Sequence, residues 1–96
     1  MKTVTEKKLD HYFDLTTRAL KKVKLMKGLT EKQKAQAEDC LDFAKRYFSD
    51  AKYFREKGDW VTAFAAVTYA HAWLDAGARL ELFDVGGDSE LFVVDK

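Results

Sequence analysis

The sequence predicts an all-α fold: an antiparallel up-down-up three-helix bundle with a short C-terminal extension. The chain of 96 residues contains no proline, which permits long uninterrupted helices. Two short stretches, residues 28–30 and 58–59, combine a glycine with a residue that can cap a helix. They divide the chain into three helical segments, and such short links force consecutive helices to lie antiparallel. We expect residues 1–96 to form one helical-bundle domain.

The first helix is predicted over residues 5–27. Its apolar side chains recur at helical spacing and form one stripe. They are Leu9, Tyr12, Phe13, Thr16, Ala19, Leu20 and Val23. Lysines crowd the last turns, where cations suit the negative end of the helix dipole. Gly28 is expected to end the helix.

The second helix is predicted over residues 31–57. Thr30 is a natural N-cap, and Gln33 completes a capping box. The apolar stripe comprises Ala37, Cys40, Leu41, Ala44, Tyr47, Phe48, Ala51 and Phe54, and Phe43 widens it. Because Cys40 lies inside this stripe, we interpret it as a small core residue rather than a reactive thiol.

The third helix is predicted over residues 60–82, after a turn at Gly58 and a cap at Asp59. It is apolar on nearly all sides, which is typical of a helix buried on most sides. We therefore expect it to be the central helix, packed in the groove between the other two. Its predicted core residues are Trp60, Phe64, Val67 and Leu74.

The C-terminal extension is predicted to begin at residue 83, with Gly86 and Gly87 stopping the helix. Residues 89–94 form a short apolar run that favours a β-strand. Because a lone strand cannot satisfy its own hydrogen bonds, we expect the run to fold back over the bundle or to pair with a partner.

Four runs in the second half of the chain resemble a known family. They are YFSDAKYF (47–54), KGD (57–59), AFAAV (63–67) and YAHAWLDAGARL (69–80). They are similar to a family of short archaeal proteins described as domain of unknown function 357. The resemblance implies a small all-helical domain of archaeal source, and it transfers no activity and no catalytic residue. The pattern of that family usually has glycine where this chain has Ala72 and Glu81.

Composition excludes several classes of protein. The formal net charge of +1 favours neither nucleic acid nor membrane for the molecule as a whole. A single cysteine excludes an intramolecular disulfide and a cysteine-based zinc site. No run approaches the ~20 apolar residues of a membrane span, and the first residues lack the apolar centre of a signal peptide. We expect a cytoplasmic protein that has no membrane contact, no metal and no cofactor.

A cluster of polar residues on the third helix is the first candidate site. Thr68, His71, Asp75 and Arg79 follow spacings of three, four and four, which places them on one helix face. A carboxylate four residues from a histidine can orient the imidazole as a general base. The alternative is a structural network in which buried polar groups satisfy one another. No serine or cysteine nucleophile is evident beside them, which favours the structural interpretation, and we assign no catalytic residue.

A basic region is the second candidate site. It consists of Arg18, Lys21, Lys22, Lys24, Lys27, Lys32 and Lys34, with Glu31 as the only acid in that stretch. The predicted turn brings these charges to one end of the bundle, where they can hold the phosphates of an anion or an RNA. Aromatic side chains that could stack on bases are absent from residues 18–34, which weakens this hypothesis.

Protein association is the function that the sequence favours most. The central helix has apolar residues on more sides than two neighbouring helices need to cover. Tyr53, Tyr69 and Trp73 are amphipathic aromatic residues of the kind enriched at interfaces. We therefore predict a non-enzymatic interaction module that binds a protein partner or a second copy of itself. The alternatives are an anion- or RNA-binding protein that uses the basic region, and an enzyme that uses His71 and Asp75.

Overall fold

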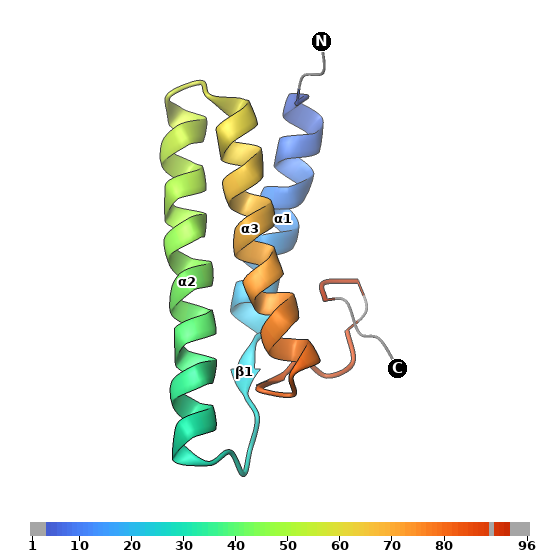
Figure 1. The fold of residues 1–96 in the computed structure, drawn as a ribbon. Coiled ribbons are helices and arrows are strands. Elements are labelled where there is room, and N and C mark those ends of the chain that lie inside the picture. Colours follow the sequence, from blue (N-terminus) through green and yellow to red (C-terminus); the bar gives the residue numbers. More distant parts are fainter. Residues whose placement is uncertain (1–3, 89, 93–96) are drawn as a thin grey trace.

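Three helices run alternately down, up and down the long axis of the molecule (Figure 1). The computed structural model describes residues 4–88 and 90–92. Its elements are α1 (Glu6–Lys22), β1 (Lys24–Leu25), α2 (Glu31–Glu56), α3 (Trp60–Arg79) and β2 (Phe83–Asp84). The central helix is α3, which packs against both α1 and α2. The predicted all-α bundle is therefore confirmed, and its extents are 46 × 24 × 22 Å.

The predicted helix starts are confirmed by their caps. The Thr30 hydroxyl accepts a hydrogen bond from Gln33 N, and the Gln33 side chain accepts one from Thr30 N, which completes the capping box. Asp59 accepts a hydrogen bond from Thr62 N at 3.1 Å. Hydrogen bonds from the side chain and from the backbone N–H of Thr62 lower the pKa of the Asp59 carboxyl. Because these bonds satisfy backbone donors that are free at a helix N-terminus, they place the starts of α2 and α3.

The prediction that the first helix reaches residue 27 is wrong. α1 ends at Lys22, and the next residues form the strand β1, which pairs antiparallel with β2. Lys24 lies opposite Asp84 and Leu25 opposite Phe83, and Met26 N donates to Leu82 O at 2.9 Å. Pairing with a segment about 60 residues away overrides the helical pattern of residues 23–27, because tertiary contacts outweigh local propensity.

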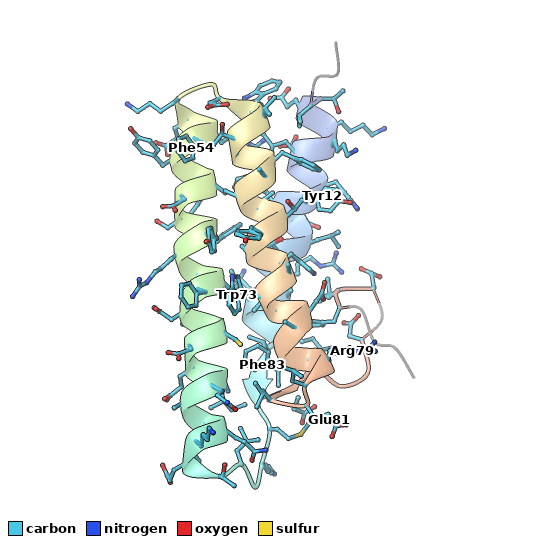
Figure 2. All side chains as sticks on the ribbon, in the orientation of Figure 1. Tyr12, Phe54, Trp73, Arg79, Glu81 and Phe83 are labelled. Atoms are coloured by element: carbon cyan, nitrogen blue, oxygen red, sulfur yellow. The ribbon has the colours of Figure 1, made fainter. Side chains whose placement is uncertain are left out.

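The third helix also ends earlier than the predicted residue 82. α3 ends at Arg79, and Glu81 adopts a positive φ of 60° that reverses the chain direction. The chain then buries Leu82 and Phe83, and Phe83 is only 1% exposed. The Phe83 ring packs directly over Gly77 of α3, where any Cβ would lie 2.2 Å from a ring carbon (Figure 2).

The core lies along the central helix, as predicted, with one exception. Val67 and Leu74 are fully buried between the helices, and Phe64 is half-buried with its ring edge-on to Tyr12. Trp60 was predicted as core but is 36% exposed, because it is the first residue of α3 and lies at the open end of the bundle. At that end Arg55 of α2 forms an ion pair with Asp10 of α1.

The C-terminal segment folds back over the bundle, as expected, but without the predicted strand. Gly86 and Gly87 both have positive φ and form a turn after β2 rather than stopping the helix. Residues 90–92 lie in a turn and bend, where Phe92 N donates to Asp88 O at 3.1 Å. The rest of the predicted strand, residues 89 and 93–94, lies outside the described part of the chain.

Candidate functional sites

His71 connects three parts of the fold. Its Nε2 lies 2.5 Å from the carbonyl oxygen of Leu91, and its Nδ1 lies 3.0 Å from the hydroxyl of Thr16 on α1. Because a carbonyl can only accept, Nε2 carries the hydrogen. In the neutral ring Nδ1 then accepts from the Thr16 hydroxyl, which belongs to a fully buried residue. Both ring nitrogens are thus engaged in holding the C-terminal segment and α1 on α3.

The other predicted members of the polar cluster lie on α3 with His71, and a catalytic role for them stays a hypothesis. The Asp75 carboxylate lies 3.8 Å from His71 Nε2, which is longer than a hydrogen bond. Thr68 donates to Ala65 O within its own helix, and Arg79 is the exposed last residue of α3 (Figure 2). These positions support the structural interpretation of His71, whose partners come from α1 and the C-terminal segment.

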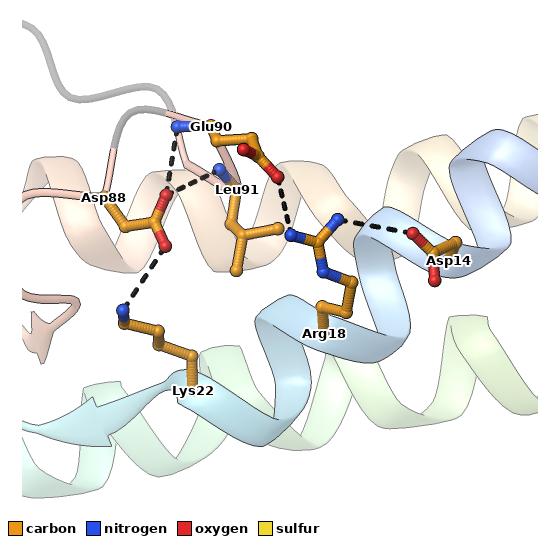
Figure 3. Close-up of polar contacts among 6 residues, drawn as sticks. All are labelled: Asp14, Arg18, Lys22, Asp88, Glu90 and Leu91. Carbon is orange, nitrogen blue, oxygen red and sulfur yellow. Dashed lines mark hydrogen bonds and ion pairs between the residues drawn. The ribbon is translucent and has the colours of Figure 1, made fainter.

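The basic region is partly occupied by acidic side chains (Figure 3). Arg18 lies 3.3 Å from Asp14 and 2.5 Å from Glu90, and Lys22 lies 3.3 Å from Asp88. The pKa of the Asp88 carboxyl is lowered by the backbone N–H of Leu91 and by Lys22. These two cations of α1 are therefore engaged with the C-terminal segment.

The remaining members of the basic region are spread over several elements. Lys24 lies on β1 opposite Asp84, Lys27 lies in the next turn, and Lys34 pairs with Glu31 at 3.7 Å. Lys21 and Lys32 are exposed. Because α1 ends five residues earlier than predicted, Lys24 and Lys27 belong to the strand and the turn that follow the helix. Anion binding by this region stays a prediction.

An aromatic surface lies on the side of α3 that α1 does not cover. The rings of Phe43 and Trp73 stack with centroids 4.8 Å apart, and those of Tyr47 and Tyr69 meet edge to face at 4.7 Å. Tyr69 nevertheless remains 57% exposed. Figure 2 shows Trp73 between α2 and α3. We call this surface the α2–α3 face, and it comprises Phe43, Tyr47, Ala65, Tyr69, Ala72, Trp73 and Ala76.

Two shallow pockets hollow the α2–α3 face. The larger, of about 410 Å³, is lined by Tyr47, Asp50, Phe54, Thr62, Ala65, Ala66 and Tyr69. The smaller, of about 230 Å³, is lined by Tyr69, Ala72, Trp73 and Ala76. Tyr69 and Trp73 were predicted as interface residues, whereas Tyr47 and Phe54 were assigned to the core stripe of the second helix. Phe43, which widens that stripe, is the sequence signal that could have indicated a second apolar surface.

The lone cysteine is buried, as predicted for a core residue. Cys40 belongs to the apolar cluster around Leu74, and desolvation raises the pKa of its thiol, with a further contribution from Asp39. A raised pKa keeps the thiol protonated and poorly nucleophilic. Within residues 4–88 and 90–92, no three potential ligands from His, Cys, Asp and Glu gather around a common point.

A comparison with known families gives one match. The family model described as "Protein of unknown function (DUF357)" matches residues 11–83, which confirms the predicted family. The match includes most of α1 and all of α2 and α3, and it ends at the start of β2. No curated protein and no solved structure matches the chain. In the described part of the chain, no helix has the length and apolar character needed to cross a membrane.

Proposed function

The chain belongs to the DUF357 family, and we propose that it is a non-enzymatic interaction module that self-associates through the α2–α3 face. One observation carries this proposal. Every exposed residue of α3, a helix that is described along its whole length, is uncharged except Arg79 at its end. Exposed helix faces are normally polar or charged, so a long uncharged face is typical of a surface that a partner covers.

The size of the face suits a protein interface. The 20 residues of α3 extend for ~30 Å. With α2 alongside, the surface is ~20 Å wide, so it offers ~600 Å². A standard interface buries ~800 Å² on each partner. Tyrosine and tryptophan are enriched in interfaces, and both occur on the α2–α3 face.

A second copy of the chain fits this face better than an unrelated surface does. Two copies of α3 that pack antiparallel around a two-fold axis bring each helix start close to the other helix end. Asp59 of one copy then lies near Arg79 of the second copy, and Lys57 lies near its Glu81. The exposed alanines at positions 65, 72 and 76 leave room for close approach of the two helices. This arrangement would therefore place opposite charges next to each other at both ends of the paired helices.

The test is the oligomeric state of a variant that carries a charge in the middle of the face. We expect sedimentation equilibrium to show a dimer for the natural protein. Ala72→Glu should weaken the dimer at least ~10-fold, because the carboxylate loses water without gaining a partner. The control is Ser49→Glu, which places the same charge on an exposed position of α2 away from the face. A strict monomer, or equal dissociation constants for the two variants, would overturn the proposal.

The cytoplasmic location predicted from composition stays part of this proposal. Anion binding and catalysis are less well supported. Arg18 and Lys22 already hold acidic side chains, and both nitrogens of His71 are engaged within the fold. No observation favours either alternative over association.

A further inference from the structure

Asp88 and residues 90–92 lie against α1 and α3 on the side of the bundle that faces away from α2 (Figures 1 and 3), and we call the surface that they cover the α1–α3 groove. At its floor, Leu91 is 5% exposed and Phe92 is 2% exposed. Both belong to the apolar cluster that includes Ala19 of α1 and Leu74 of α3. The Phe92 ring lies over the imidazole of His71, with centroids 6.3 Å apart. The groove thus provides an apolar floor for two consecutive apolar side chains.

The edge of the groove supplies charge. Arg18 binds Glu90 at 2.5 Å and Lys22 binds Asp88 at 3.3 Å, and these cations lie one helical turn apart on α1 (Figure 3). The two acids precede the apolar pair with one residue between them. The groove therefore matches a segment of the form acid, any residue, acid, apolar, apolar.

A third contact is independent of the side chains of the bound segment. His71 Nε2 donates to the main-chain oxygen of Leu91 at 2.5 Å. Recognition of linear segments typically combines main-chain hydrogen bonds, which contribute affinity, with side-chain pockets, which contribute specificity. Here α1 and α3 provide both kinds of contact, together with charged partners at the edge.

The residues that form the groove lie inside the region that the family model matches, and its occupant lies outside that region. Arg18, Lys22 and His71 all lie within the matched residues 11–83, whereas residues 88–92 follow the matched region. The occupant follows a hydrogen-bonded turn after β2, in which Gly86 and Gly87 have φ of 65° and 70°. Arg18 and Glu90 remain 47% and 67% exposed, so water weakens this ion pair. The segment is thus joined by a short turn and is held partly by weak surface contacts.

We propose that the α1–α3 groove is a binding site for a linear segment of another protein, with two acidic residues followed by two apolar residues. Residues 88–92 are its intramolecular occupant and compete with that partner. Because the link to β2 is short, the tethered segment has an effective concentration on the order of millimolar. The natural protein therefore binds an added segment weakly, and release of the tether raises the apparent affinity.

The test uses a fluorescently labelled peptide with the sequence of residues 86–96 as the probe. The full-length chain with Leu91→Ser and Phe92→Ser provides an empty groove, and fluorescence anisotropy measures binding. We expect this variant to bind the peptide at least ~10-fold more tightly than the natural chain does, since its own segment no longer competes. Binding should weaken between 50 and 500 mM salt, because two ion pairs contribute to it. A peptide with the same two serine substitutions should not bind.

A second pair of changes keeps the proposal testable if the serine variant fails to fold. Full-length Asp88→Arg with Glu90→Arg removes the two ion pairs and the hydrogen bonds that Asp88 accepts from Glu90 N and Leu91 N. It should also release the segment, because four cations then face one another. Adding Arg18→Glu to the serine variant should abolish binding of the natural peptide and allow binding of a peptide with Glu90→Arg. Absence of peptide binding to a folded released variant, or equal binding of a scrambled peptide, would overturn the proposal.

Two further outcomes separate this site from the α2–α3 face. Ala72→Glu should leave peptide binding unchanged, and Arg18→Glu should leave the dimer unchanged. A dimer of the natural chain that dissociates when Leu91 and Phe92 are changed, but not with Ala72→Glu, would show exchange of the segment between two copies. That result would overturn the assignment of the groove to a separate protein.

Discussion

At the scale of single residues, Glu81 shows most clearly how backbone geometry constrains the side chain. Among the described residues, it is the only one other than glycine with a positive φ, at 60°. This conformation brings Cβ close to the following carbonyl, which glycine avoids. The turn between α3 and β2 thus requires a backbone conformation that glycine adopts more readily than glutamate does.

We expect Glu81→Gly to stabilise the protein. Removing the side chain relieves the left-handed strain and should raise the free energy of unfolding by ~1 kcal/mol. Glu81 is exposed, so no core packing is lost. Urea unfolding followed by circular dichroism measures the change. Glu81→Ala is the matched control and should give no gain, since alanine keeps the Cβ; equal stabilisation by both would contradict this explanation.

His71 shows what local spacing leaves open. The sequence places Asp75 four residues away, on the same helix face, and this predicts a pair. In the structure Asp75 lies 3.8 Å from the imidazole, but the hydrogen bonds of the ring go to Thr16, which lies 55 residues away, and to the carbonyl of Leu91, which lies 20 residues away. Spacing in the sequence identifies the neighbours of a residue within its own helix. It does not identify the residues of other elements that pack against that helix.

At the scale of elements, the pair of strands β1 and β2 determines how α1 and α3 end. Phe83 of β2 packs against Gly77 of α3, and Leu25 of β1 lies opposite Phe83. The short strands therefore bring the end of α1 and the end of α3 together. This contact depends on the missing side chain at Gly77, which allows the aromatic ring to touch the helix backbone.

We expect Gly77→Ala to destabilise the protein, although alanine favours a helix by ~1 kcal/mol over glycine. The new Cβ would lie 2.2 Å from a carbon of the buried Phe83 ring, and such overpacking typically costs 1–3 kcal/mol. Thermal unfolding gives the measurement. Phe83→Leu should lower the stability less in the Gly77→Ala variant than in the natural chain, since the smaller side chain relieves the clash. Equal costs in the two backgrounds would argue against this contact.

At the scale of the whole molecule, the bundle has one covered side and one open side. α1, β2 and residues 90–92 cover α3 from one direction, and α2 covers it from another. The α2–α3 face, with its exposed Tyr69 and Ala72, is left without a fourth element. A second copy placed there would give α3 neighbours on all sides, as its apolar sequence requires.

Association through this face predicts that stability depends on protein concentration. Only folded chains form the dimer, so a higher protein concentration favours the folded state. The midpoint of thermal unfolding should therefore rise by roughly 5 °C over a hundredfold increase in protein concentration. Differential scanning calorimetry measures this shift. For Ala72→Glu the midpoint should stay constant, and a constant midpoint for the natural protein would exclude a dimer coupled to folding.

The sequence by itself determined the number and order of the helices, the caps at Thr30 and Asp59, and the central place of α3. These features depend on neighbouring residues and on periodicity, so they are local. Only the tertiary structure decided where α1 ends, which partners His71 binds, and that Arg18 and Lys22 hold the C-terminal segment. It also decided which apolar face stays open. Periodicity shows that residues share a face, but the elements that cover that face come from distant parts of the chain.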